Sequence, residues 1–385
     1  MELLTVNFRT MNQFANVKDF GAIGDGTHDD TLAFQTAVNS ISPYGSLLVP
    51  EGTYRISNTI TFPSAQGYNG ITFFGTGFGS IIKPTSNVKL LFDLVGENLS
   101  IKDLAFDGSN TTDAIAIRIG GSNGTINNGF IEVEHCQFTV WKTAIQTTTD
   151  SWTVKSCYFI DANKGVHCLN NALNSSVNDC YFLGGEVSVH LARETQQPEG
   201  MRIYDNTMLN TKENAKSVLI EAGLEIHIFN NIIDQTGKNG WATYIKPSAG
   251  SAIVNVKITN NWLDSGLHGG SLSADSVTGL WVESNSLNCA SGDAVGFSLS
   301  NINTYWVKNN FWLNSFSVPS LLSNNYNGNV TGNAYAPAQN TTPLELNEFR
   351  NPLNIPGGVI LTSPNGNRYA LAVNNWGRLY TQKLP

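Results

Sequence analysis

The sequence predicts an all-β fold: a right-handed single-stranded parallel β-helix (solenoid) with an N-terminal capping helix and a small C-terminal β module. Three observations predict it. A six-residue motif recurs nine times along the middle of the chain, short β-branched runs separated by turn residues fill the intervals, and an amphipathic helical stripe precedes them. Repeats of roughly 20–50 residues are typical of solenoids, and short apolar runs between turns favour strands.

The motif defines the coils of the solenoid. Its fourth position is occupied in turn by Leu104, Cys136, Cys157, Cys180, Asn206, Asn231, Asn261, Asn285 and Asn310. The eight intervals average about 26 residues, and their uneven lengths predict loops of variable size. Because stacked strands lie about 4.8 Å apart, the asparagines predict a ladder of buried side-chain hydrogen bonds. The cysteines before the ladder are expected to be small core residues with free thiols.

A second run follows the motif in each coil, for example GVHCLN from Gly165 and VSVHLA from Val187. A period of two along these runs points alternate residues into the core. The residues expected to face inward are Ile117, Cys168, Val189, Ile220, Ile245 and Leu299.

The segment before the repeat has a helical pattern. It reads VKDFGAIGDGTHDDTLAFQTAV from Val17 and continues with LLVPEGTYRIS from Leu47. Gly24 and Gly26 allow a tight turn, and Thr27 with Asp30 predicts a capping box. The acidic pair Asp29 and Asp30 is expected to cap the helix. Its apolar stripe, which covers the open end of the solenoid, consists of Phe34, Ala37, Val38 and Ile41.

These two stretches resemble the leading motif of the pectate-lyase-like β-helix superfamily, as it is found in bacteriophage tail spikes and depolymerases. The resemblance covers roughly residues 15 to 335. The chain then divides into an N-terminal segment with the capping helix (1–57), the parallel β-helix (58–333), and a linker with a small β module (334–385). In this last part, three expected strands are separated by PNGN and NNWG turns.

Composition narrows the possible partners. The chain is 41% hydrophobic and 14% charged, with a formal net charge of −8. A net anion is not attracted to nucleic acid or to an anionic membrane, and no apolar run is long enough for membrane insertion. The first ten residues show no leader pattern. Neither a CxxC spacing nor a His triplet with a carboxylate occurs, so we expect no metal and no cofactor.

The outward positions of the second run are the candidate ligand-binding surface, because a solenoid presents ligands to a long face. We expect substrate contacts from His167, His190, Arg193, Tyr244 and Lys246. The expected outward column is Arg118, Gln146, His167, His190, Glu221, Tyr244 with Lys246, Ser273 with Asp275, and Ser298. Trp141, Trp241, Trp262, Trp281 and Trp306 offer faces for sugar stacking, although about half should simply pack.

The candidate catalytic residues are Glu221, Asp275 and Glu194. Glycosidases use two carboxyl groups, about 5–5.5 Å apart in retaining enzymes and about 6.5–9.5 Å apart in inverting ones. Glu221 and Asp275 are two coils apart, roughly 9.6 Å, which favours inversion. A further pair, Asp234 and Asp264, should align one coil apart in the turn after the ladder, where a structural role is expected.

The resemblance implies a tail-spike-like protein that binds and depolymerises a bacterial surface polysaccharide (capsule, lipopolysaccharide or wall glycan) by glycosidic hydrolysis. Two alternatives stay open: a polysaccharide lyase of the same fold, and a non-catalytic receptor-binding spike. The resemblance also implies a homotrimer located in the virion, or otherwise outside the cell. Because few residues precede the leading motif, attachment through another virion protein is expected.

Overall fold

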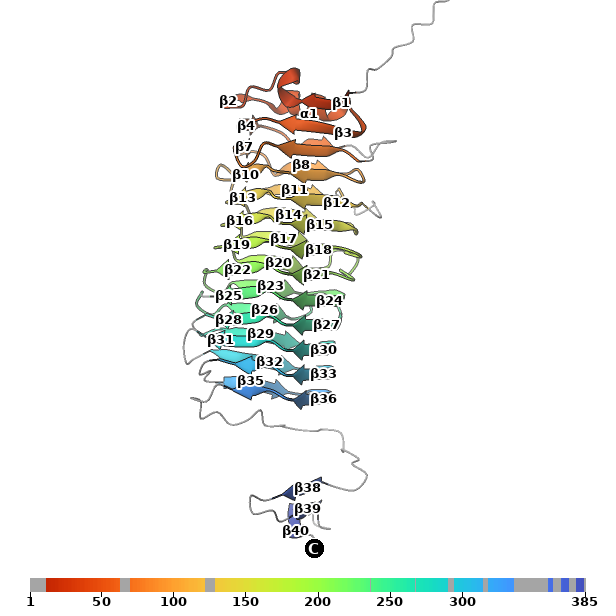
Figure 1. Cartoon of the computed structure of the whole chain (residues 1–385), viewed down its shortest axis with the longest axis vertical. Coiled ribbons are helices and arrows are strands. Elements are labelled where there is room, and N and C mark those ends of the chain that lie inside the picture. Colours follow the sequence, from red (N-terminus) through yellow and green to blue (C-terminus); the bar gives the residue numbers. More distant parts are fainter. Residues whose placement is uncertain are drawn as a thin grey trace, which may run out of the picture. The chain divides into compact units, whose positions relative to one another are not determined.

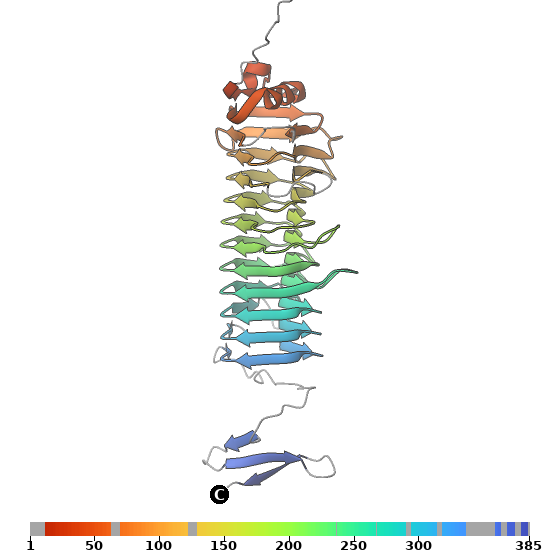
Figure 2. The ribbon, with the colours of Figure 1, turned by 90° about the vertical axis from the view of Figure 1, so that its right-hand side faces the viewer.

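The structure is a computed structural model that describes residues 12–62, 70–121, 129–235, 237–266, 268–289, 294–313, 318–335, 359–362, 368–373 and 379–383. The chain forms two compact units, Met1–Asn347 and Glu348–Pro385. The first unit is a stack of coils whose strands form three parallel sheets (Figure 1 and Figure 2). The predicted parallel β-helix is therefore confirmed.

Each sheet takes one strand from each coil, in chain order. Sheet A consists of β1 (Asn12–Asn16), β3 (Ile41–Val49), β6 (Thr72–Gly75), β9 (Ser100–Lys102), β12 (Ile131–Glu134), β15 (Trp152–Lys155), β18 (Ser176–Asn178), β21 (Arg202–Tyr204), β24 (Gly223–Phe229), β27 (Ile253–Thr259), β30 (Thr278–Glu283), β33 (Asn303–Lys308) and β36 (Tyr326–Thr331). Sheet B consists of β2 (Asp25–Asp29), β4 (Gly52–Ile56), β7 (Ser80–Pro84), β10 (Ala105–Asp107), β13 (Gln137–Thr139), β16 (Tyr158–Ile160), β19 (Tyr181–Leu183), β22 (Thr207–Asn210), β25 (Ile232–Gln235), β28 (Trp262–Ser265), β31 (Ser286–Cys289), β34 (Phe311–Trp312) and β37 (Ala334–Tyr335). Sheet C consists of β5 (Ile60–Phe62), β8 (Leu90–Leu94), β11 (Ile115–Ile119), β14 (Thr143–Thr147), β17 (Lys164–Cys168), β20 (Val187–Leu191), β23 (Lys216–Ile220), β26 (Trp241–Ile245), β29 (Gly270–Asp275), β32 (Val295–Ser300) and β35 (Val318–Ser323).

The turn from sheet A to sheet B is held by the predicted asparagine ladder. The five ladder residues from Asn206 to Asn310 are 1–2% exposed. The Nδ2 of each of the first four donates to the Oδ1 of the next at 2.9–3.0 Å, and Asn310 donates to a further rung, Asn333, at 3.0 Å. The residue before each of these five rungs has a positive φ and is Asp, Asn or Ser, short polar residues that suit such a turn. The three cysteines in this column are buried and free.

The interior is a continuous apolar core. Phe106, Phe138, Phe159 and Phe182 stack with ring centroids 4.5–5.1 Å apart, one ring per coil. The six residues expected to face inward from the second run are all at most 1% exposed. Like side chains therefore meet in register from coil to coil, and the coils support one another.

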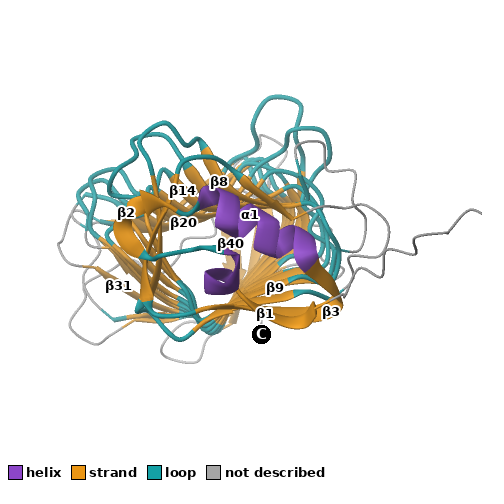
Figure 3. Cartoon of the chain, turned by 90° about the horizontal axis from the view of Figure 1, so that it is seen from above, coloured by secondary structure: helices purple, strands orange, loops and turns teal. Residues whose placement is uncertain are grey.

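The helix α1 (Thr31–Ser40) lies across the N-terminal end of the coils (Figure 3), next to the short 3-10 helix η1 (Val17–Phe20). Phe34, Ala37 and Val38 are buried as predicted, but Ile41 is buried in β3, so the helical stripe ends earlier. The predicted capping box is wrong.

The reason lies in the glycine turn before α1. Asp30 accepts hydrogen bonds from the backbone amides of Ile23 at 2.7 Å and Gly24 at 3.2 Å, so its carboxylate is not available to the helix. Asp29 accepts from the amide of Thr31 at 3.1 Å and supports the first turn instead.

The second unit contains an antiparallel sheet of β38 (Val359–Thr362), β39 (Arg368–Val373) and β40 (Leu379–Lys383). Three strands were predicted here. The PNGN and NNWG turns lie outside the described residues, and the boundaries placed at residues 57 and 333 stay predictions.

Candidate functional site

Polar side chains gather on the outer face of sheet C in the middle coils. Strand pairing places Gln146, His167, His190, Leu219 and Tyr244 in one column, one residue per coil. The sequence pattern had put Glu221 in this column, and that placement is wrong. Strands such as β17, β23 and β26 bury their second, third and fifth residues and turn the first and fourth outward, so a strict period of two does not hold.

Two histidines form the centre of this column. The rings of His167 and His190 are stacked, with centroids 4.5 Å apart and planes within 5°. His167 Nε2 and His190 Nδ1 are buried and have no hydrogen-bond partner in the described part of the chain. Buried polar atoms are normally paired, so these two nitrogens are exceptions within the described residues.

Both rings are neutral near neutral pH. Burial, with His190 and Lys164 adding, lowers the pKa of His167 to about 2. Burial, with Lys164 and Lys216 adding, lowers the pKa of His190 to about 3. The Glu221 carboxylate opposes this shift, but burial dominates because the His190 side chain is 7% exposed whereas that of Glu221 is 38% exposed and screened by solvent.

His190 Nε2 lies 2.7 Å from Glu221 Oε2. A neutral ring satisfies this contact by donating its Nε2 proton to the carboxylate, which leaves a lone pair on His190 Nδ1. The contact is therefore a hydrogen bond that orients Glu221 rather than a buried ion pair.

A second row of charged groups follows the ends of the same strands. Ile220, Ile245 and Ala274 pair in register, so the next residues, Glu221, Lys246 and Asp275, hold equivalent places in successive coils. Lys246 Nζ is 3.9 Å from Asp275 Oδ2. The backbones of Glu221 and Asp275 are two coils apart, about 9.6 Å by strand spacing, with Lys246 in the coil between them.

Asp275 is held in its ionised form. Burial by itself would raise its pKa, but side-chain hydrogen bonds and the charge of Lys246 outweigh burial and lower the pKa of Asp275 below its usual value. The donors are Asn301 Nδ2 at 2.8 Å, Ser276 Oγ at 3.0 Å and Ser300 Oγ at 3.1 Å. All three donors bond Oδ1, two of them from the next coil, while Oδ2 lies on the side of Lys246 in the preceding coil.

The loop after β20 crosses this row. The Arg193 guanidinium donates to the carbonyl of Gly250, and Gln197 Oε1 accepts from the amide of Ala252 at 2.9 Å. These contacts tie the loop to the one that follows β26. Glu194 in the same loop is exposed, and no hydrogen bond or ion pair among the described residues joins it to Glu221.

Two lysines beside the histidine column were not predicted. Lys164 and Lys216 are the first residues of β17 and β23, where the side chain faces outward. Lys216 Nζ lies 5.1 Å from the centroid of the Tyr244 ring, a cation–π contact. Burial lowers the pKa of Lys164 although Glu221 acts in the opposite direction. The sequence could have indicated both lysines, because each is the first residue of its strand, KGVHC or KSVLI, and the first position faces outward.

The remaining sequence candidates lie elsewhere. Asp234 and Asp264 do pair one coil apart, but they are inside β25 and β28 on sheet B, so the predicted turn position is wrong. Burial raises both pKa values; Asp264 gains a further increase from Asp234, and its Oδ2 accepts from Asn288 at 2.6 Å. Arg118 is paired with Asp93 at 2.6 Å and is structural. No cluster of three metal-binding side chains occurs within the described ranges.

The described residues contain no helix long and apolar enough to cross a membrane.

The site combines a neutral histidine pair, an oriented carboxylate, an ionised carboxylate and three lysines on the outer face of a parallel β-helix. Such a face can bind a long hydroxyl-rich or acidic chain and transfer a proton to or from it.

Fold and sequence together define the class of protein. Residues 14–198 match the family model described as rhamnogalacturonase A/epimerase, pectate lyase-like. The chain is thus a parallel β-helix whose residues 14–198 are similar to this pectate-lyase-like family, in line with the resemblance seen in its sequence.

Curated relatives come from several kinds of protein. The chain is 34% identical over 115 residues to mannuronan C5-epimerase AlgE6 of Azotobacter vinelandii, which covers 26% of this chain and 13% of that protein. It is 24% identical over 218 residues to an uncharacterized 65.4 kDa protein in the cps region of Klebsiella pneumoniae, a match that covers 52% of this chain and 32% of that protein. It is 33% identical over 119 residues to the preneck appendage protein of Bacillus phage PZA, covering 29% and 14%. The chain thus spans less than a third of the length of these relatives.

Solved structures share the fold at low identity. A GH87 alpha-1,3-glucanase of Streptomyces thermodiastaticus superposes with a TM-score of 0.58 at 19% identity, covering 84% of this chain and 66% of that one. DFA-IIIase of Arthrobacter chlorophenolicus superposes with a TM-score of 0.65 at 12% identity, covering 82% of this chain and 94% of that one. The surface adhesin PfbA of Streptococcus pneumoniae superposes with a TM-score of 0.54 at 15% identity, covering 83% of this chain and 99% of that one.

Proposed function

We propose that this protein binds a bacterial surface polysaccharide along sheet C and cleaves it by glycosidic hydrolysis, as part of a phage tail-spike-like assembly. The observation that carries the proposal is the row of Glu221, Lys246 and Asp275 beside the histidine column. The matches to a phage preneck appendage protein and to the uncharacterized protein in a cps region support it.

In this proposal the two carboxylates have different roles. Asp275, held ionised by its three donors, is the base that takes a proton from the attacking water. Glu221 acts from its protonated form: its Oε2 accepts from His190 Nε2, and its Oε1 carries the proton that passes to the leaving glycosidic oxygen. Separation by two coils leaves room for the water, which favours inversion of the anomeric centre. Lys246 and Tyr244 contact the sugar chain. Arg193 holds the loop after β20 at the border of this binding surface through its bond to Gly250.

A second candidate function is removal of a proton next to a uronic carboxylate, as in a lyase. His190 favours it, because its buried neutral ring carries a lone pair on Nδ1 and lies near Lys164 and Lys216, which would hold the acid group. The relative named as a mannuronan C5-epimerase supports it. A non-catalytic receptor-binding spike is the outcome if no glycan is changed.

We further propose that the chain assembles as a homotrimer and attaches to the virion through another virion protein. An apolar column on the outer face of sheet B supports assembly. Its large side chains are 38–51% exposed, in register along the sheet, and would be covered in an oligomer. They are Tyr158, Ile232, Trp262 and Phe311.

The test uses capsule, lipopolysaccharide, teichoic-acid and pectin preparations, with product mass and ultraviolet absorbance as readouts. Glu221→Gln and Asp275→Asn should each abolish cleavage while glycan binding persists, because an amide keeps the shape but cannot transfer the proton. Glu51→Gln, an exposed change in the first coils, is the control.

The outcomes separate the candidate functions. Products without an unsaturated sugar, lost in both carboxylate variants, support hydrolysis. Ultraviolet-absorbing products that depend on His190 or Lys246 rather than Asp275 indicate elimination. Full activity of both carboxylate variants refutes the assignment of this site, and binding without any change of the glycan leaves the receptor-binding spike.

A further inference from the structure

Sheet A carries a hollow that is separate from the polar face of sheet C. Its volume is about 330 Å³. The lining residues come from three successive strands of one sheet: Glu225, Ile226 and His227 of β24, Asn255 and Lys257 of β27, and Trp281 of β30.

The backbone of these strands makes the hollow. Glu225, Asn255 and Gly279 all have positive φ, at 56°, 57° and 78°, so each of the three strands bends at this point. A Cβ on Gly279 would lie 2.6 Å from Asn255 Oδ1 and 3.2 Å from the Trp281 ring. A side chain at position 279 would collide with Asn255 and crowd the Trp281 ring, so the glycine keeps the space open.

Trp281 forms the wall on the C-terminal side. Its ring stacks on that of Trp306, with centroids 4.8 Å apart and planes within 10°. One face of Trp281 is thus covered, while the other is turned toward Lys257, whose Nζ lies 5.7 Å from the ring centroid. A rigid aromatic face next to a polar hollow suits the C–H face of a pyranose ring.

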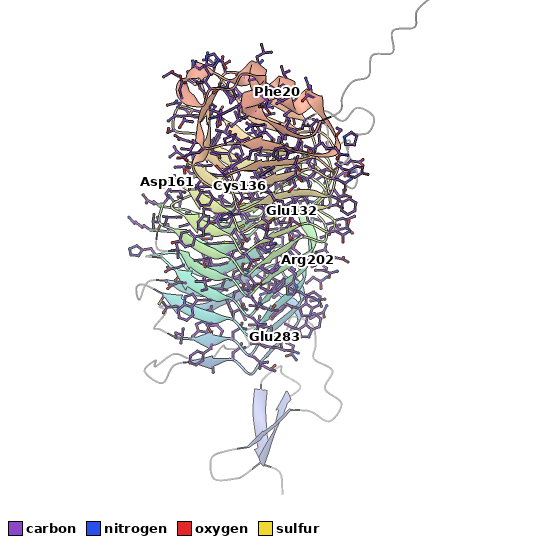
Figure 4. All side chains as sticks on the ribbon, turned by 45° about the horizontal axis from the view of Figure 1, so that its top comes forward. Phe20, Glu132, Cys136, Asp161, Arg202 and Glu283 are labelled. Atoms are coloured by element: carbon purple, nitrogen blue, oxygen red, sulfur yellow. The ribbon has the colours of Figure 1, made fainter. Side chains whose placement is uncertain are left out.

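The charges of the hollow indicate what kind of sugar it takes. Arg202, His227, Lys257 and Trp281 follow one another in register, one per coil. Burial and Lys257 lower the pKa of His227, so the two exposed cations of this column are Arg202 and Lys257. Glu225 is the one acidic residue of the lining. Figure 4 labels Arg202 on β21 and Glu283 on β30, the strands on the N-terminal side and at the C-terminal side of the hollow.

We infer that the hollow binds an acidic pyranose, a uronic acid unit of a polysaccharide, as a second glycan-binding site. The ring stacks on Trp281, the carboxylate pairs with Lys257, and Asn255 and Glu225 bond the hydroxyls. The site holds the chain without acting on it, so the inference does not depend on cleavage at sheet C.

The test measures binding, not cleavage, by titration calorimetry in a background that carries Glu221→Gln, Lys164→Met, Lys216→Met and Lys246→Met, so that the lysines of sheet C do not bind the acidic probes. The acidic probes are oligogalacturonate and oligomannuronate, and the neutral probe is a malto-oligosaccharide of equal length. Trp281→Ala should weaken binding of an acidic probe about tenfold or more, which corresponds to about 1.4 kcal/mol. Lys257→Met should weaken it similarly and reduce its dependence on salt, because Arg202 remains as a cation in the same column.

Two variants on the same sheet serve as matched controls. Tyr204 stacks on Phe229 at 4.9 Å but lies outside the hollow, and Lys308 on β33 is likewise not among its lining residues. Tyr204→Ala and Lys308→Met should bind like the parent protein. Thermal melting, monitored by circular dichroism, checks that each variant is folded. If Trp281→Ala is destabilised, the binding result of Lys257→Met is used instead, because Lys257 is exposed and its substitution should not disturb folding.

The inference is overturned if Trp281→Ala and Lys257→Met bind as the parent does, if no acidic probe binds, or if the neutral probe binds as tightly as the acidic ones. Loss of cleavage in Glu221→Gln with uronate binding retained concerns sheet C alone. The two proposals can therefore fail independently.

Discussion

Replacing Asn261 by leucine tests whether the asparagine ladder stabilises the coils. Asn261 Oδ1 accepts from Asn231 Nδ2 at 2.9 Å and from the Asn231 amide at 3.0 Å. Its Nδ2 donates to the carbonyls of Ile228 at 3.0 Å and Thr259 at 3.1 Å, and to Asn285 Oδ1. Leucine removes all of these bonds but keeps the bond from the residue 261 amide to Asn285 Oδ1.

The magnitude follows from which groups lose their partner. Asn231 Nδ2 retains the carbonyls of Ile203 and Phe229, whereas the Asn231 amide loses the side-chain acceptor that it has in the ladder. One buried donor left unpaired costs about 1–3 kcal/mol. We therefore expect the free energy of unfolding to fall by about 1–3 kcal/mol.

Two further variants define the comparison. Asn261→Cys should cost less, because Cys180 Sγ already accepts from the Cys157 amide at 3.4 Å in the same column. Asn303→Leu changes an exposed asparagine of sheet A and should have little effect. The measurements are the denaturant midpoint and hydrogen exchange at the Asn231 amide. An unchanged midpoint together with unchanged exchange in Asn261→Leu would refute the reasoning.

Three further predictions follow from the same structure. Asp264→Asn should stabilise the protein near neutral pH and have little effect near pH 3. The pKa of Asp264 is higher in the folded state than its unfolded pKa of about 3.9, so the stability of the parent protein falls as pH rises from the unfolded pKa through the folded pKa. Asparagine cannot ionise and avoids this loss. Equal effects at both pH values in denaturant titrations would contradict this. A thiol reagent should label none of the five buried cysteines in the native protein and all five in denaturant; rapid native labelling would argue against the packed column. Light scattering at micromolar concentration should give the mass of a trimer, and a monomer would refute that proposal.

Much of the fold could be read from the sequence because each coil repeats the same local demands. A short polar residue with positive φ, a ladder residue and a short apolar run recur in order, and the stack places like residues together. The helix over the first coil was visible as an apolar stripe. Its cap was predicted wrongly because the Asp30 carboxylate bonds a turn formed seven residues earlier, a choice that local spacing does not reveal.

The candidate site was only partly visible in the sequence. The sequence by itself determined that His167 and His190 share one outward column, because their positions follow from coil spacing. It placed Glu221 in that column as well, whereas the structure puts Glu221 and Asp275 in the neighbouring row. Only the tertiary structure decided that Glu221 turns back to His190 while Asp275 Oδ1 bonds donors of the next coil. Side-chain direction, burial and hydrogen-bond partners depend on atoms from neighbouring coils about 25 residues away, and a one-dimensional pattern fixes register without fixing those contacts.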